Sequence, residues 1–305
     1  MPQASEKNAQ QALLRPEILQ TLKGLSLLSR QMVGAFLNGM HQSRRAGEGA
    51  EFRQYRAYQP GDDLRRLDWK MYARSDRFYI READTETHLH VRLVLDRSAS
   101  MRHEDQNRLS KLDFARLVAA SLAYLAQLQG DRVSLWVLPV EPRPAQVLSG
   151  AASRDGFRAL LYALLQVQAE GQFPLLPPDL PQKPGEGREM IVFISDLYQA
   201  QDEMVQCLRR WRKQQHEVIC LHLLAQNELT LDYGQDARFE DWETGQRKTV
   251  HLASARTQYL ENLQTQLQAL RQAVLAQQVE YASFGMHEAL EQVFRLFLER
   301  RKRLL

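Results

Sequence analysis

Two aspartates that each end an apolar run carry the clearest chemical signal in the chain. The first opens the spacing Asp96-x-Ser98-x-Ser100 after the run HVRLVL, and the second, Asp196, follows MIVFIS. One carboxylate and two hydroxyls from a short loop suit a hard cation that prefers oxygen ligands. Two buried carboxylates also repel each other unless a cation or hydrogen-bond donors compensate them. The pattern therefore predicts a site for Mg²⁺ or Mn²⁺ at Asp96, Ser98, Ser100 and Asp196, with capping of the following helices as the alternative.

The chain around these aspartates alternates between strand-like and helix-like patterns. Apolar runs predict strands at 90–96, 132–140, 190–196, 218–224 and 279–284, and a weaker strand at 146–148. Amphipathic spacing predicts helices at 112–128, 153–168, 202–214, 253–276 and 287–301. Such alternation is typical of an α/β fold with a mostly parallel sheet and helices on both faces. Ligands of such sheets bind beyond the carboxyl ends of the strands, where both aspartates lie.

Two other segments extend this α/β pattern. Apolar spacing predicts an N-terminal helix over about 18–36, and the region 42–86 then lacks periodicity and contains a turn at Pro60-Gly61. A small β-hairpin insertion is predicted within 229–251, around the Glu-Thr-Gly at 243–245. We therefore expect an N-terminal helix and an extended, arginine- and aromatic-rich arm at 1–85, followed by the α/β domain at 86–305.

Two blocks of sequence resemble a known family. LVLDRSASM together with FISD is similar to the metal-ion-dependent adhesion site of von Willebrand factor A domains, and GEGAEFRQYRAYQPGDDLRRLDWKMYARSDRFYIRE resembles the signature of the bacterial domain-of-unknown-function family 58. The resemblance covers about 25–301. It implies a von Willebrand factor A-like, Rossmann-like fold, a cytoplasmic location and cooperation with a MoxR-type AAA+ ATPase. It also implies that Asp96, Ser98, Ser100 and Asp196 bind the metal.

The chain departs from the family pattern at one expected ligand. The pattern usually supplies a threonine from a loop before the third helix, and the corresponding place here reads Glu170-Gly171-Gln172-Phe173. A proline-rich stretch, PLLPPDLPQKPGEG, follows it. The loss of a direct hydroxyl ligand should weaken metal binding.

Composition and charge exclude several other classes of protein. No stretch approaches the roughly 20 apolar residues of a membrane span, and the N-terminus lacks the apolar core of a signal peptide. Cys207 and Cys220 form no metal-binding or disulfide pattern, so reduced structural thiols are expected. The net charge is only +3, and acidic residues interleave with the arginines of the arm. That mixture favours internal ion pairs or a protein-binding surface over a nucleic-acid surface.

These features favour a binding protein over an enzyme. The leading hypothesis is a non-enzymatic adaptor that grips an unknown client protein with the strand-end face, with or without Mg²⁺, and brings it to the AAA+ ATPase. One alternative is a purely structural subunit with a non-functional metal site. Another is a metal-dependent hydrolase or phosphotransferase that uses Asp96, but phosphate-loop and nucleophile-elbow motifs are absent, and His103 is the only nearby candidate base.

Overall fold

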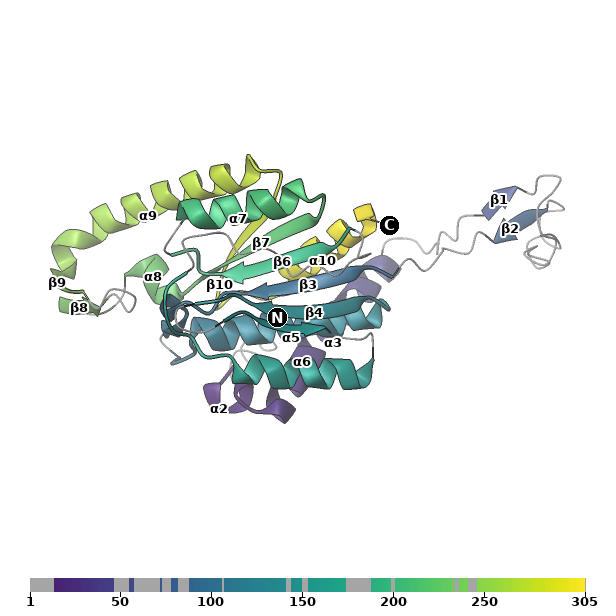
Figure 1. The fold of residues 1–305 in the computed structure, drawn as a ribbon, viewed down its shortest axis with the longest axis horizontal. Helices are drawn as coiled ribbons and strands as arrows, with labels where there is room; N and C mark the ends of the chain where they lie inside the picture. The colour runs from purple at the N-terminus through teal and green to yellow at the C-terminus, as the bar shows by residue number, and fades with distance from the viewer. Residues whose placement is uncertain are drawn as a thin grey trace. The chain divides into compact units, whose positions relative to one another are not determined.

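A six-stranded sheet with the strand order β10-β7-β6-β3-β4-β5 forms the centre of the fold (Figure 1). The structure is a computed structural model and describes residues 14–46, 55–57, 72, 78–81, 88–105, 107–140, 144–149, 153–173, 188–198, 201–231, 233, 236–240 and 246–304. The strands are β3 (His90–Leu95), β4 (Arg132–Val137), β5 (Gln146–Ser149), β6 (Met190–Ser195), β7 (Glu217–Leu224) and β10 (Glu280–Gly285). All neighbours are parallel except β4 and β5.

Counted along the chain, this order is 3-2-1-4-5-6, the arrangement of a doubly wound α/β sheet. The predicted α/β fold, a mostly parallel sheet with helices on both faces, is confirmed. The inner strands are apolar along their whole length because both of their faces are covered, as in β6, where every residue is buried. The weaker strand predicted at 146–148 is the antiparallel edge strand β5.

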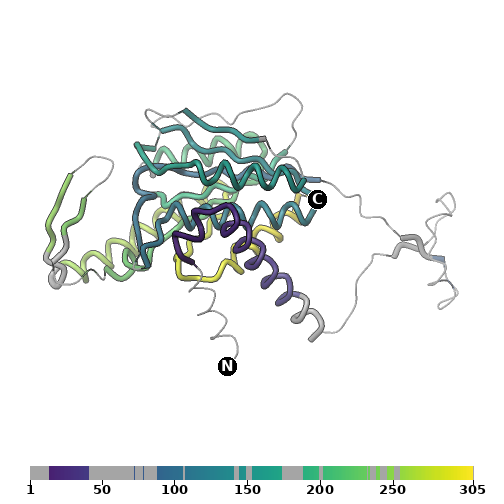
Figure 2. Tube along the Cα trace, turned by 90° about the horizontal axis from the view of Figure 1, so that it is seen from below, coloured from purple at the N-terminus to yellow at the C-terminus, as the bar shows by residue number. Residues whose placement is uncertain are grey.

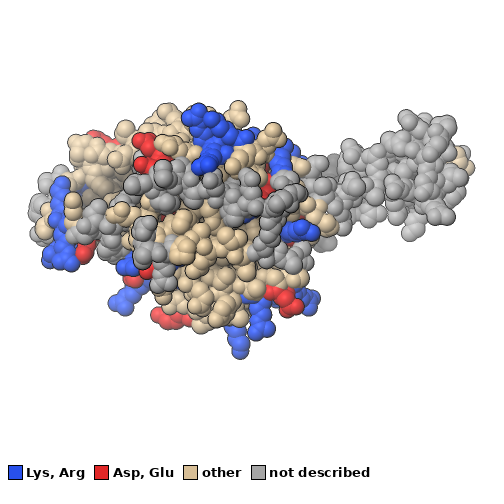
Figure 3. Space-filling model, in the orientation of Figure 1, with Lys and Arg blue, Asp and Glu red and all other residues tan. Residues whose placement is uncertain are grey.

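Helices α7 (Gln201–Lys213) and α9 (Leu252–Leu275) cover one face of the sheet. Trp211 of α7 lies edge-on to Trp136 of β4 and Phe193 of β6, with ring centroids 5.8 and 5.7 Å apart. Basic side chains occupy the last turn of α7, where they complement the helix dipole, and Figure 3 shows lysine and arginine gathered over this region.

Helices α5 (Lys111–Leu128) and α10 (Glu291–Leu304) cover the opposite face. Helices α2 (Pro16–Leu19) and α6 (Arg154–Gln166) lie on this side as well, as do residues 22–36 of α3 (Leu22–Ala46). In Figure 2 the N-terminal helix in purple lies beside the C-terminal helix in yellow. Phe36 and Phe294 join these helices with ring centroids 5.4 Å apart. This extra layer explains why 15 of the 18 residues of α5 are buried.

Two buried carboxylates lie at the amino ends of the parallel strands. Glu189, just before β6, receives two hydrogen bonds from Arg92, at 2.6 and 2.7 Å. Asp131, just before β4, is fully buried and receives hydrogen bonds from the Arg301 guanidinium at 2.6 and 2.9 Å. Each ion pair joins elements that are distant in the sequence, so both help to fix the order of the sheet.

The chain forms two compact units, one of Met1–Phe36 with His88–Leu305 and one of Leu37–Thr87. We expected the N-terminal helix to belong with the arm at 1–85; instead, its residues up to Phe36 group with the α/β domain. Within the second unit, β1 (Tyr55–Ala57) pairs antiparallel with β2 (Tyr79–Arg81), and the Tyr72 and Phe78 rings stack with centroids 4.4 Å apart. The predicted turn at Pro60-Gly61, most side chains of the arginine-rich arm and the proline-rich stretch lie outside the described residues.

The predicted hairpin insertion is confirmed. It consists of β8 (Asp236–Glu240) and β9 (Arg247–His251), which pair antiparallel, while its Glu-Thr-Gly tip lies outside the described residues. A short helix that we did not predict, α8 (Gln226–Thr230), precedes the hairpin. Across the part of the chain that the structure describes, no helix is both long and apolar enough to cross a bilayer.

Candidate functional site

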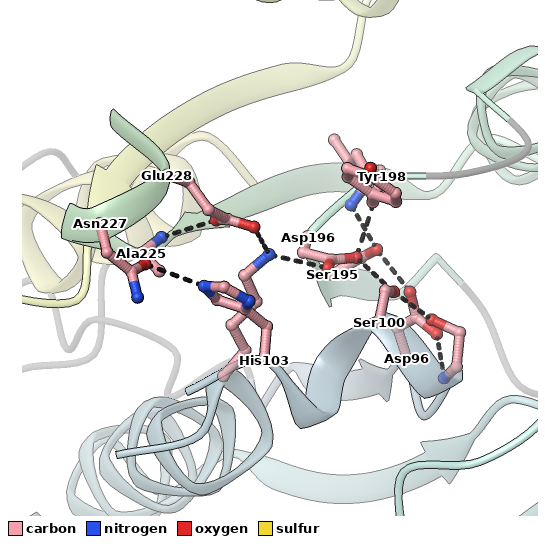
Figure 4. Close-up of polar contacts among 12 residues, drawn as sticks. Asp96, Ser100, His103, Ser195, Asp196, Tyr198, Ala225, Asn227 and Glu228 are labelled. Carbon is pink, nitrogen blue, oxygen red and sulfur yellow. Dashed lines mark hydrogen bonds and ion pairs between the residues drawn. The ribbon is translucent and has the colours of Figure 1, made fainter. Parts of the chain in front are cut away.

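The four predicted site residues lie together where β3 and β6 end. These neighbouring strands lead to opposite sides of the sheet, since the chain goes from β3 to β4 and from β6 to β7. Asp96 directly follows β3, and Asp196 directly follows β6 (Figure 4). The backbone N–H of Asp96 still donates to the carbonyl of Ile194, at 3.0 Å, so the two strand ends are held in register. This position is the topological switch point of the sheet.

Asp96 is fully buried, and hydrogen bonds hold both of its carboxylate oxygens. Oδ1 accepts from the backbone N–H of Ser98 at 2.9 Å, and Oδ2 accepts from the hydroxyl of Ser195 at 2.6 Å. Burial and the neighbouring Asp196 carboxylate nevertheless raise the pKa of Asp96 to about 6. Among the described residues no ion pair includes Asp96, so its charge is compensated by dipoles alone.

The two serines connect the Asp96 loop to Asp196. The hydroxyl oxygens of Ser98 and Ser100 are 3.1 Å apart, and the Ser100 hydroxyl donates to Oδ1 of Asp196 at 3.1 Å. Ser98 precedes the 3₁₀ helix η2 (Ala99–Arg102), but its side chain makes no capping hydrogen bond. The cap of α5 is instead Ser110, which accepts from the N–H of Asp113 at 3.0 Å. For the Asp96 loop, the observed contacts therefore differ from those of the helix-capping alternative; Asp196 accepts from the backbone N–H of Tyr198 at 3.4 Å, and the residues just before α7 lie outside the described part of the chain.

A buried ion pair adjoins this cluster, and the sequence analysis did not identify it. The ammonium of Lys111 lies 2.9 Å from Oδ2 of Asp196 and 2.7 Å from Oε1 of Glu228. Burial alone would lower the pKa of Lys111, but the two carboxylates raise it above its ordinary value. A lysine in the first turn of a helix opposes the helix dipole, which is the one signal that could have drawn attention to Lys111.

The loop that lacks the expected threonine does reach the site. The carbonyl of Gly171 accepts from the N–H of Ala99 at 2.9 Å, and the N–H of Glu170 donates to the carbonyl of Arg97 at 2.8 Å. The Glu170 carboxylate turns to the Arg97 guanidinium, at 2.8 Å. Gly171 has a φ of +72° and no side chain. The loop is thus in the expected place but brings no hydroxyl from Gly171.

The donors fit a small divalent cation in kind and in spacing. Oxygens bound to Mg²⁺ at adjacent octahedral positions are about 3.0 Å apart, because each bond measures about 2.1 Å. The Ser98 and Ser100 hydroxyl oxygens match this separation at 3.1 Å. In the described part of the chain no three His, Cys, Asp or Glu side chains gather in a metal-binding arrangement. A cation held by Asp96, Ser98, Ser100 and Asp196 would therefore depend on the hydroxyls, and on water, as well as on two carboxylates.

His103, the candidate base, is directed to α8 instead of to Asp96. Its Nε2 lies 2.8 Å from Oδ1 of Asn227 and 3.4 Å from the hydroxyl of Tyr233. The nearby Asp105 carboxylate accepts from the backbone N–H groups of Gln226 and Asn227, at 3.0 and 3.2 Å. These contacts fasten the segment after η2 to α8.

A family model described as "Protein of unknown function DUF58" matches residues 54–269. The uncharacterized proteins Rv1480 of Mycobacterium tuberculosis and Mb1516 of Mycobacterium bovis are each 28% identical over 244 residues, which span 75% of this chain and 72% of theirs.

Among solved structures, similar folds include the conserved hypothetical protein BatB from Bacteroides thetaiotaomicron, at 15% identity and a TM-score of 0.44, covering 70% of this chain and 99% of that one. The von Willebrand A domain of SpRpn10 has 11% identity and a TM-score of 0.37, covering 68% of this chain and 94% of that one.

Proposed function

Because the chain belongs to the DUF58 family of proteins of unknown function, we propose that it is a non-enzymatic, cytoplasmic protein-binding adaptor. Its contact surface is the carboxyl edge of the sheet over the cluster of Asp96, Ser98, Ser100 and Asp196, of which only Ser100 is partly exposed. These residues hold Mg²⁺ or Mn²⁺. The proposed partners are an unknown client protein and a MoxR-type AAA+ ATPase.

The observation that carries this proposal is the connected cluster of two carboxylates and two hydroxyls at the switch point of the sheet. Both aspartates are buried, at 0% and 3% exposure, and both are fixed by hydrogen bonds. A rigid oxygen cluster beneath a loop surface is suited to recognition, because its geometry is set before a partner arrives. Tyr198, two residues after Asp196, is 62% exposed and offers an aromatic contact next to the cluster.

The surrounding residues support binding over catalysis. Lys111 is paired with two carboxylates, and His103 contacts Asn227 and Tyr233, so neither faces Asp96 as a general base. When bound, a divalent cation supplies positive charge and an open coordination position for an acidic oxygen of the partner. Asp96 and Asp196 anchor the cluster, Ser98 and Ser100 offer hydroxyl ligands, and Ser195 fixes the orientation of Asp96.

A second candidate function is a structural subunit that works without a cation. The loop at Gly171 favours this second candidate. The family pattern has a threonine ligand in this loop, and Gly171 supplies no hydroxyl. Titration calorimetry that detects no binding of Mg²⁺ or Mn²⁺ by the wild-type chain would support this candidate over the adaptor with a metal site.

Affinity capture tests the adaptor proposal directly. The wild-type chain, Asp96→Ala and Ser98→Ala are immobilised and exposed to native lysate with Mg²⁺ or with EDTA, and peptides of MoxR-type AAA+ ATPases are quantified by mass spectrometry. We expect the wild type to retain the ATPase in Mg²⁺ and both variants to lose it. Glu261→Ala, which removes an exposed carboxylate of α9, is the matched control and should behave as wild type.

Binding of the captured ATPase is then repeated with purified proteins, and circular dichroism verifies that each variant is folded. A folded Asp96→Ala chain that keeps every partner at unchanged affinity overturns the proposed contact surface. Retention that depends on Asp96 but not on Mg²⁺ keeps the surface and removes the cation from the proposal.

A further inference from the structure

The Lys111–Glu228 pair is the part of the strand-end cluster whose function is still unassigned. Lys111 is the first residue of α5, and its side chain is only 2% exposed. Its ammonium bonds Oδ2 of Asp196, while the other oxygen of the same carboxylate accepts from Ser100. Glu228 is fixed in turn, because its Oε2 accepts from the backbone N–H of Ala225 at 3.0 Å.

We propose that Lys111 and Glu228 set the affinity of the cation site, with the fixed ammonium beside Asp196 keeping divalent-cation binding weak and reversible. The inference rests on the cation in the proposed function. It assigns two residues, from α5 and α8, to a site that the sequence pattern placed only on the strand ends.

The charges of the cluster explain the expected effect. The cluster contains three carboxylates, those of Asp96, Asp196 and Glu228, and one ammonium, which pairs with Asp196 and Glu228, so two negative charges remain for a divalent cation to balance. The ammonium repels such a cation and also draws electron density from Asp196. Glu228 offsets part of that repulsion because it pairs with the same ammonium. In a buried site the repulsion by Lys111 and its compensation by Glu228 are both large, since charges interact strongly at low effective dielectric constant.

A purely structural lysine would have the opposite effect on cation affinity. If Lys111 only held Asp196 in place, its removal would free Asp196 and weaken cation binding. If it sets the affinity through its charge, its removal strengthens binding. The direction of the change therefore distinguishes the two explanations.

Isothermal titration calorimetry with Mg²⁺ and Mn²⁺ measures this direction on the full chain. We expect Lys111→Met, which keeps an apolar stem of similar length, to bind at least about tenfold more tightly than wild type. Glu228→Gln should bind more weakly than wild type, because the ammonium is then less well compensated. The double variant, which restores the net charge, should bind more tightly than Glu228→Gln. Lys213→Met removes an exposed lysine of α7 and should match wild type.

The outcomes separate this inference from the proposed function. If a folded Lys111→Met chain binds the cation as tightly as wild type, or more weakly, the inference is overturned. The cation site of the proposed function then still stands. If Lys111→Met binds a cation and wild type does not, the inference is supported. Lys111 then prevents cation binding in the wild-type chain. If neither chain binds a cation, the inference and the metal site both fail. If Lys111→Met does not fold, Glu228→Gln decides: weaker binding supports the inference, and unchanged binding overturns it.

Discussion

Asp96 and Glu189 are buried carboxylates at opposite ends of the parallel strands, Asp96 at the carboxyl end of β3 and Glu189 at the amino end of β6. They differ in what compensates their charge. Glu189 faces the Arg92 guanidinium and His90, whose Nδ1 is 2.9 Å away. Burial alone would raise the pKa of Glu189, but the bonds from Arg92 and His90 lower it to about 2. Asp96 has only dipoles and an acidic neighbour, and its pKa is raised. The charge of Glu189 is thus compensated by cationic side chains, and that of Asp96 by hydrogen-bond donors alone.

The depressed pKa of Glu189 predicts how stability changes with pH. The group contributes stability above its unfolded pKa of about 4.5, and this contribution is lost as the pH falls toward about 2. Glu189→Gln should lower the free energy of unfolding by about 3 kcal/mol at pH 7 and flatten its pH dependence between about pH 5 and 2, the window of the shift. Urea denaturation at several pH values measures both effects.

The control for that experiment is Glu240→Gln. Glu240 pairs with Arg247 at 3.0 Å on the exposed hairpin, so its loss should change stability by less than about 1 kcal/mol. Equal losses in the two variants would show that burial of the Arg92–Glu189 pair is not what matters.

At this scale the sequence predicted part of the cluster. Asp96, Ser98, Ser100 and Asp196 were identifiable because strand periodicity places them at strand ends, and the structure brings all four together. Lys111 and Glu228 were not, because their contact joins residues 117 positions apart. Neither residue lies in a motif. Helical periodicity indicates which face of a helix is apolar, but not which polar side chains of two different elements will be in contact.

Among the elements, α5 is central to the packing, because 15 of its 18 residues are buried. It lies between the sheet and the outer helices, and Arg116 in its second turn donates to the carbonyl of Leu164 in the last turn of α6, at 3.0 Å. Its first turn contains Ser110, Lys111 and Asp113, so the start of the helix and the edge of the strand-end cluster share the same few residues.

Loss of the N-cap of α5 should therefore lower the free energy of unfolding measurably. Ser110→Ala removes the acceptor of the Asp113 N–H and should lower the free energy of unfolding by about 1 kcal/mol. Ser26→Ala, the same change inside α3, should have no cost or a slight benefit, because alanine is the better helix former. Chemical denaturation of the two variants side by side measures the difference. A loss in Ser26→Ala as large as that in Ser110→Ala would contradict the capping explanation.

The regular elements were predictable, and the irregular ones were less so. Long apolar runs and amphipathic spacing identified the six strands and the main helices, with ends shifted by a few residues: α10 begins at Glu291, where we expected 287. The helix α8 was missed because five residues are too few to show periodicity. The pair β1–β2 was missed because its three-residue strands lie within aperiodic sequence.

For the molecule as a whole, the division into two units leads to a test by deletion. Replacing residues 37–87 with a flexible Gly/Ser linker should leave cooperative unfolding of the remaining chain largely intact, because residues up to Phe36 group with the α/β unit. Removing 1–87 completely should instead destabilise and aggregate the protein, since it strips buried Leu19, Leu25 and Phe36 from the helical layer. Thermal unfolding and size-exclusion chromatography distinguish the two chains. Equal behaviour would show that the N-terminal helix is dispensable.

The pairing of Asp131 with Arg301 has a consequence for the order in which the protein matures on the ribosome. Asp131 is fully buried just before the second strand of the sheet, and its cation comes from the helix after the sixth. A buried carboxylate without its cation is strongly destabilising. The nascent chain can therefore form strands and helices as they emerge, but it cannot close this edge until α10 has been translated. Completion of the domain is therefore coupled to the synthesis of α10.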